Sequence, residues 1–186
     1  MNAKELYQAG RLADAISALI GELRQNPGDT QRRAFLFELL AFAGDYDRAE
    51  RQLNALPQGD SAMDLWVLVG RAALAVERQR QQMFARGDYP AVPESEPPVI
   101  SGVINGRPFL SLEDADARFG VKLELMAAGR YMWIPLEHVA AMRIEPPRRL
   151  RDLLWLPAQI RTGPAFRDIE LGEVLLPTLY PLSWRH

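Results

Sequence analysis

Two glycines, Gly10 and Gly44, begin matching segments of this chain 34 residues apart. Each segment reads glycine, charged residue, large apolar residue, spacer, charged residue and then alanine, which is Ala15 in the first copy and Ala49 in the second. Glycine ends a helix with a turn at positive φ, where a side chain would be strained. The small alanine leaves room where the next helix crosses the first. The two segments therefore predict two helical hairpins of one design.

A period of about 34 residues is that of the tetratricopeptide helix–turn–helix repeat. Pro27 follows Ala15 by twelve residues and ends the second helix, as this repeat requires. Apolar spacing predicts a helical pair in residues 3–26 and further helices at about 30–43, 46–56 and 61–85. Arg78 stands where a third turn glycine would fall. We therefore expect five helices, the last of which caps the array.

A proline-rich stretch separates this half of the chain from the rest. Residues 87–98 hold four prolines and three acidic residues, which predicts an extended linker. We expect a tetratricopeptide-like domain at 1–86 and a second domain at 99–186. The tetratricopeptide repeat usually presents a groove to a segment of another protein.

The second half has the pattern of strands. Asn105-Gly106 lies between two apolar runs at 99–104 and 107–110, which predicts a hairpin with a type I′ turn. Further strands are expected at 121–126, 130–134, 141–144, 156–161 and 174–176, with one helical turn at 135–139. The chain is therefore predicted to be α+β, with helical hairpins followed by a small, mostly antiparallel domain.

Composition excludes several classes of function. The net charge is −2, and basic and acidic residues nearly balance in both halves, so nucleic-acid binding is not expected. The chain has no cysteine, which fits a reducing compartment. The start of the chain lacks a signal-peptide core, and no apolar stretch is long enough to span a membrane. We predict a cytoplasmic protein without membrane contact.

Few residues suit catalysis or metal binding. The two histidines are His138 and His186, and no nucleophile elbow, zinc motif or phosphate loop is present. The acidic stretch 111–116 fits the first turn of a helix with a Ser111–Asp114 capping box better than a cation site. We predict no catalytic residue, no metal site and no cofactor.

One basic cluster stands out, formed by Arg148, Arg149 and Arg151 with Arg143 nearby. These arginines could grip an acidic partner or a phosphate. They could equally form one face of a short helix over 147–154, paired with Asp152 or Glu145. The second interpretation is favoured, because one basic patch in a neutral chain is weak evidence for binding.

Some residues of the repeat half are candidates for partner binding. Leu36, Phe37 and Leu40 fall at packing positions between helices and are expected in the core. The candidates on the groove side of the first helices are Tyr7, Phe35, Glu38, Phe42 and Trp66. A groove with two phenylalanines suits the apolar face of a helix better than a charged chain end.

The second half resembles the ImpE (TagJ) family of type VI secretion accessory proteins. The resemblance lies in residues 129–139, 143–155 and 172–181, and it extends to 111–116 and to the repeat-like first half. Its most specific part is Glu-Pro-Pro-Arg-Arg-Leu-Arg-Asp-Leu-Leu-Trp at 145–155. Family members generally continue beyond the point that matches His186, so the resemblance leaves open whether the chain is a shortened member with an incomplete second domain.

The resemblance implies a cytoplasmic, non-enzymatic protein that binds an N-terminal helix of the small subunit of the contractile sheath. It would act on sheath assembly, or on disassembly by the associated unfoldase. Two alternatives stay open: a tetratricopeptide scaffold for another client, and a small enzyme or ligand sensor. The second would use a pocket formed by Arg130, His138 and the arginines of 148–151.

Overall fold

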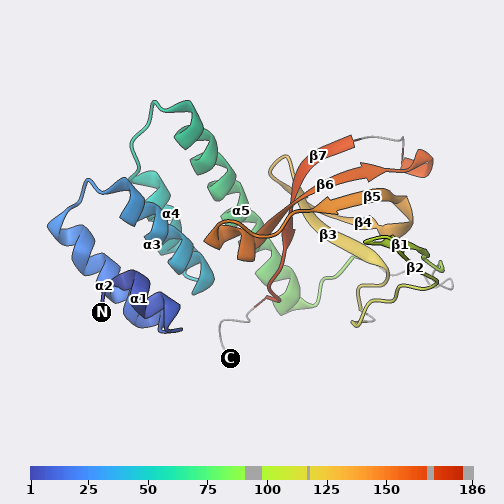
Figure 1. Ribbon diagram of the computed structural model, residues 1–186, viewed down its shortest axis with the longest axis horizontal. Helices are drawn as coiled ribbons and strands as arrows, with labels where there is room; N and C mark the ends of the chain where they lie inside the picture. The colour runs from blue at the N-terminus through green and yellow to red at the C-terminus, as the bar shows by residue number, and fades with distance from the viewer. Residues whose placement is uncertain (91–97, 117, 167–169, 182–186) are drawn as a thin grey trace. The chain divides into compact units, whose positions relative to one another are not determined.

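The computed structural model describes residues 1–90, 98–116, 118–166 and 170–181 (Figure 1). The chain divides into two compact units, one holding Met1–Gln79 with the chain end from Tyr180, and the other holding Arg80–Leu179. The division falls inside a helix rather than at the proline-rich stretch. Residues 91–97 of the expected linker lie outside the described residues, so the boundaries at 86 and 99 stay a prediction.

The first half of the chain is helical, as expected. Its helices are α1 (Ala3–Gln8), α2 (Leu12–Gln25), α3 (Thr30–Phe42), α4 (Tyr46–Asn54) and α5 (Ser61–Arg86). The turn glycines Gly10 and Gly44 have φ of 74° and 68°. Ala15 and Ala49 are fully buried, at 0% exposure each. The repeated segments therefore form the two hairpins α1–α2 and α3–α4, for the reasons that the sequence indicates.

Side-chain caps fix where these helices start. The side chain of Asn2 accepts a hydrogen bond from the amide of Glu5, and Asp29 and Asp45 accept bonds from the amides of Arg32 and Arg48. The bond from the Arg32 amide, more than any other interaction, lowers the pKa of Asp29. These caps satisfy amides that have no partner inside the helix.

The helical core contains the residues expected there. Leu36, Phe37 and Leu40 are buried, together with Leu39 on the same helix. Apolar residues lie on more than one side of α3, since Phe35 and Phe42 fall outside the arc of the buried leucines, and such a helix suits a place between neighbours. It packs against α2 on one side and α4 on the other.

The second half is antiparallel sheet, in agreement with the predicted fold class. A two-stranded sheet pairs β1 (Gly102–Ile104) with β2 (Arg107–Phe109). A five-stranded sheet has the order β4-β3-β7-β6-β5. Its strands are β3 (Lys122–Ala127), β4 (Arg130–Pro135), β5 (Val139–Ile144), β6 (Trp155–Thr162) and β7 (Glu170–Pro177).

Two tight turns set the register of the hairpins. Asn105 and Gly106 have φ of 51° and 79°, as the expected type I′ turn requires. Ala128 and Gly129, at 48° and 74°, connect β3 to β4 in the same way. The two edge strands of the larger sheet, β4 and β5, follow each other in the chain and are joined by the 3₁₀ turn η1 (Leu136–His138).

One face of the five-stranded sheet carries its core. Ile160 of β6, Leu125 of β3 and Val174 of β7 are buried there, with Ile134 of β4. Residues that lie directly opposite each other on paired strands point to the same face of the sheet. Met142 and Ile144 of β5, which pair with Ile160 and Ala158, therefore lie on this core face at its β5 edge, where both are exposed.

Two local predictions were wrong. Residues 111–116 form no helix, because the carboxylates of Asp114 and Asp116 bond to amides two residues ahead and close local turns instead. The short helix expected over 147–154 is reduced to the 3₁₀ turn η2 (Leu150–Leu153). Arg148 and Arg149 therefore precede the helical turn and share no helix face with Arg151.

Candidate functional site

The five predicted binding residues all lie on the first helix of a pair or on the last helix. Tyr7 is in α1, Phe35, Glu38 and Phe42 are in α3, and Trp66 is in α5. All five are partly buried and partly exposed. Phe35, Glu38 and Phe42 follow helical spacing, so they line one side of α3. Their role in binding stays a prediction.

Tyr7 and Phe35 are brought together by the packing of the first two hairpins. Their ring centroids lie 5.9 Å apart with an interplanar angle of 89°. This edge-to-face arrangement is the favoured one for aromatic pairs, with the edge of one ring directed at the face of the other. The pair therefore holds two partly exposed rings in fixed positions on the surface.

Trp66 has a different setting. Its ring lies 5.3 Å from that of Phe37, which is 1% exposed, and the two planes meet at 76°. One side of the indole therefore belongs to the core between α3 and α5. Only the rest of the Trp66 side chain is available to a partner.

The helical unit also has an exposed apolar surface that the sequence did not indicate. Leu65 and Leu68 of α5 are 60% and 63% exposed, and Val69 lies beside them. A cavity of about 330 Å³ next to Leu68 is lined by residues of α4, the following loop and α5. The 3.6-residue period could have revealed this face, since Leu65, Leu68 and Val69 share it while Val67 and Leu74 lie opposite.

The arginine cluster has a structural explanation. The backbone amides of Arg148 and Arg149 both donate to Oδ2 of Asp152, at 2.9 Å each. Nε of Arg151 lies 4.0 Å from Oδ1 of the same buried carboxylate. Arg143 pairs with Glu145. Asp152 thus organises this loop, while Arg148 and Arg149 are exposed. The role of these arginines as a contact patch stays a prediction.

The residues of the alternative ligand pocket do not converge. Arg130 begins β4, and His138 follows its other end in η1, so the strand separates them by about 20 Å. The imidazole of His138 stacks on the ring of Phe166 at 5.4 Å. This arrangement gives the histidine a packing role and offers no shared pocket with Arg130.

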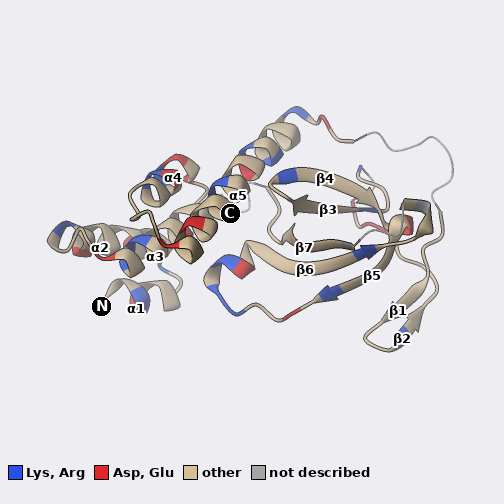
Figure 2. Ribbon diagram, turned by 90° about the horizontal axis from the view of Figure 1, so that it is seen from above, with Lys and Arg blue, Asp and Glu red and all other residues tan. Residues whose placement is uncertain are grey.

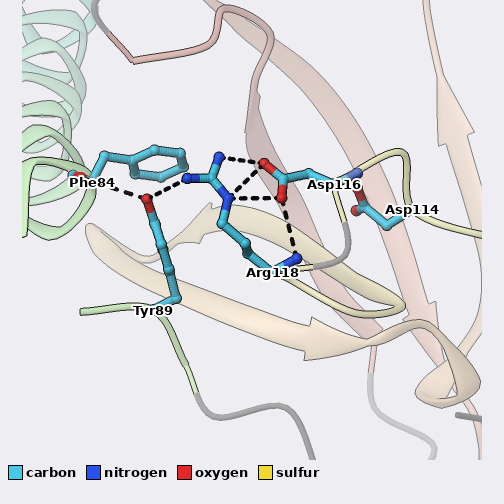
Figure 3. A network of polar contacts seen from close by, with 5 residues as sticks. All are labelled: Phe84, Tyr89, Asp114, Asp116 and Arg118. Carbon is cyan, nitrogen blue, oxygen red and sulfur yellow. Dashed lines mark hydrogen bonds and ion pairs between the residues drawn. The ribbon is translucent and has the colours of Figure 1, made fainter. Parts of the chain in front are cut away.

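A network of aromatic and charged residues joins the end of α5 to the loop that precedes β3. The guanidinium of Arg118 pairs with the carboxylate of Asp116, donates to the Tyr89 hydroxyl, and lies over the ring of Tyr89 (Figure 3). The Tyr89 hydroxyl donates in turn to the carbonyl of Phe84 in α5. The ring of Phe119 contacts both Phe84 and Tyr89. These contacts anchor the last turns of α5.

A buried ion pair also joins the end of α5 to strand β3. Arg80 of α5 donates to both carboxylate oxygens of Glu124 in β3, from Nε at 2.5 Å and from Nη2 at 3.0 Å. The hydroxyl of Tyr131 also donates to Glu124. Burial, and next this bond to Glu124, raise the pKa of Tyr131. This pair could not be found from the sequence, because Arg80 lies in a stretch with the composition of a solvated helix end.

Charges on the helices are interspersed rather than gathered. Basic and acidic residues alternate along α2, α3 and α4 (Figure 2), and ion pairs such as Arg32–Glu22 and Arg78–Glu50 connect neighbouring helices. Among the described residues, no group of three or more histidine, aspartate or glutamate side chains is placed to hold a metal ion. Within the same residues, none of the helices has the length and apolarity that a membrane crossing requires.

Comparison with known proteins shows to which family the chain is related. Residues 6–62 match the family model for a tetratricopeptide repeat, and residues 106–186 match the model for ImpE protein. The chain is 32% identical to a Pseudomonas aeruginosa protein named type VI secretion system accessory component TagJ, over all of this chain and 76% of that protein. The chain belongs to the ImpE family.

The fold of this ImpE-family protein also occurs in a solved structure. A crystal structure of a Vibrio parahaemolyticus protein matches it with a TM-score of 0.74 and 22% identity, over 97% of this chain and 79% of the other. The family models and the Pseudomonas aeruginosa relative confirm the predicted resemblance, and the solved structure shows the same fold. In the structure, the most specific stretch, 145–155, is the loop organised by Asp152, and it ends at the buried Leu154 and Trp155.

Proposed function

We propose that this ImpE-family protein is a non-enzymatic adaptor of a bacterial type VI secretion system, acting in the cytoplasm. The observation that supports this most is the relationship over the whole chain to a protein named as an accessory component of that system. The partner would be an amphipathic N-terminal helix of the sheath small subunit. The protein would then modulate sheath assembly, or disassembly by the associated unfoldase.

The geometry of the helical unit suits such a ligand. Phe35 and Phe42 occupy one side of α3, and Tyr7 extends this side onto α1. An amphipathic helix could place apolar residues of spacing i, i+3 and i+7 against these rings. Full burial of each large side chain would stabilise the complex by ~1.5–3 kcal/mol.

A binding experiment tests the proposal. The immobilised chain is presented with the sheath small subunit, either complete or without its first helix. We expect retention of the complete form only. Equal retention of both forms would reject the binding of that helix, and retention of neither would reject the sheath subunit as the partner.

Substitutions locate the site within the chain. Phe35→Ala and Phe42→Ala are expected to weaken binding of the sheath helix by tenfold or more each. Phe166→Ala is the matched control, because Phe166 is an exposed phenylalanine in the other unit. Unchanged binding by both α3 variants would contradict the proposed site.

A second candidate function is a tetratricopeptide scaffold for another protein client. The match of residues 6–62 to the repeat family favours it, since this repeat serves many clients. It would give binding to a different protein through the same α3 side chains, with no affinity for the sheath subunit. The binding experiment above separates the two.

A further inference from the structure

Helix α5 carries an apolar stripe with the spacing of a coiled-coil seam. Steps of four and three residues connect Ser61, Leu65, Leu68, Ala72, Ala75 and Gln79. Five of these residues are exposed, and Ala72 is partly exposed, whereas Val67 and Leu74 on the opposite side of the helix are buried. Alternation of four and three keeps one seam directed at a partner helix. This face is therefore shaped to receive a second helix.

Two opposite charges flank the stripe on the same side. Asp64 precedes Leu65, and Arg71 precedes Ala72 seven residues later, so both hold the same position in successive heptads. In an antiparallel pair of identical helices, residues at this position face each other across the seam. Asp64 of each helix would then meet Arg71 of the other, which gives two reciprocal ion pairs.

We propose that the stripe on α5 binds a second copy of this chain in a two-fold antiparallel dimer. Leu65 of each copy packs against Leu68 of the other, and the Asp64–Arg71 pairs close the seam on one side. A two-fold interface requires one surface that complements itself. Leucine opposite leucine and acid opposite base meet that requirement within a single helix.

The surroundings of the stripe fit this occupant. The cavity of about 330 Å³ beside Leu68 is bordered by Asp64 and Arg71 and lined by the apolar residues Leu53, Leu56, Pro57 and Val67. A leucine from the second copy can enter it from the seam. The stripe, about 27 Å long from Ser61 to Gln79, is short for a permanent dimer. Dimerisation is therefore expected to depend on protein concentration.

The mass of the full chain in solution tests the proposal. In sedimentation equilibrium over a hundredfold range of concentration, the mass should rise from the 21.0 kDa of one chain toward twice that value. Leu68→Glu should stay monomeric throughout. Leu110→Glu is the matched control, since Leu110 is an 86% exposed leucine in the other unit, and this variant should dimerise like the unmodified chain.

Exchange of the two charges tests the register. Asp64→Arg and Arg71→Asp should each weaken dimerisation at least tenfold, and the double variant should restore it to within a few-fold. Asp64 also accepts a bond from the Gly59 amide, and Arg71 donates to Asn54, so circular dichroism must show an intact fold. A double variant that is folded but does not dimerise would overturn the antiparallel pairing.

Distance measurement gives an independent reading. The chain has no cysteine, so Gln79→Cys provides one spin-label site per copy. Antiparallel pairing places the two labels about 38 Å apart along the helix axes, whereas parallel pairing places them about 10 Å apart. A short distance would overturn the proposal, and so would an unmodified chain that remains monomeric. If that monomer lost sheath-helix binding on Leu68→Glu, the stripe would belong to a client instead.

Discussion

The buried pair between Arg80 and Glu124 offers the sharpest test of what stabilises the second unit. Replacing Arg80 by Met keeps an unbranched side chain of similar length and removes the charge. The Arg80 side chain is 4% exposed and that of Glu124 is 16% exposed. The substitution therefore leaves a carboxylate that solvent reaches only in part, together with the carbonyl of Leu179, which also accepts a bond from Arg80.

The expected cost follows from these contacts. Removing one partner of a buried ion pair typically costs about 3–5 kcal/mol, because the remaining charge stays desolvated. The hydroxyl of Tyr131 still donates to Glu124, so we expect the lower end, about 3 kcal/mol. The double variant Arg80→Met/Glu124→Gln removes both charges and keeps an acceptor for Tyr131. It should recover more than half of the loss.

Urea unfolding of the full chain, followed by tryptophan fluorescence, measures these free energies of unfolding. Arg78→Met is the control, since Arg78 pairs with Asp47 and Glu50 but lies nearer to solvent. Surface pairs contribute about 0–1 kcal/mol, so Arg78→Met should cost no more than that. The reasoning fails if Arg80→Met costs as little as Arg78→Met, or if the double variant is no more stable than the single one.

Three further predictions concern other parts of the chain. Gly10→Ala should destabilise the fold by about 1 kcal/mol through backbone strain alone, because Gly10 has φ of 74° and no atom crowds the added methyl group. Gly21→Ala within α2 should instead stabilise the fold by about 0.5–1 kcal/mol, and thermal unfolding of both variants measures the difference. Asp152→Ala should lower the free energy of unfolding by about 2–3 kcal/mol, because it leaves two backbone amides without an acceptor. In the same urea unfolding experiment, Glu145→Ala at an exposed position should lower it by less than about 1 kcal/mol. The raised pKa of Tyr131 stabilises the fold fully below the ordinary tyrosine value of 10.0 and progressively less above it, so the stability advantage over Tyr131→Phe should shrink when urea midpoints are measured above that pH.

The helical half could be predicted almost to the residue, because its signals are local. A glycine at positive φ and a small residue at the helix crossing each act within a few residues of their own position, as Gly44 and Ala49 do. The same holds for the hairpin at Asn105-Gly106. Such signals need no knowledge of the rest of the fold.

Other features depend on contacts that are distant in sequence. The residues around Arg80 have the sequence of a polar helix end, and only the pairing of Arg80 with Glu124, 44 residues away, explains its burial. The acidic stretch 111–116 satisfies a capping pattern, but Asp116 instead pairs with Arg118 and closes a turn. The binding residues on α1, α3 and α5 could be proposed from repeat position, whereas their degree of burial required the packed structure.

The position of Arg80 and Phe84 has a practical consequence for dividing this protein. Both residues belong to α5, yet they pack on β3 and on the loop that carries Phe119. A fragment cut at the proline-rich stretch would begin after them and would leave Glu124 without its cation and Phe119 without one of its neighbouring rings. A fragment that contains only the sheet therefore has to start upstream of Arg80, inside α5. The complementary fragment with the helical repeats would then lack the end of that helix.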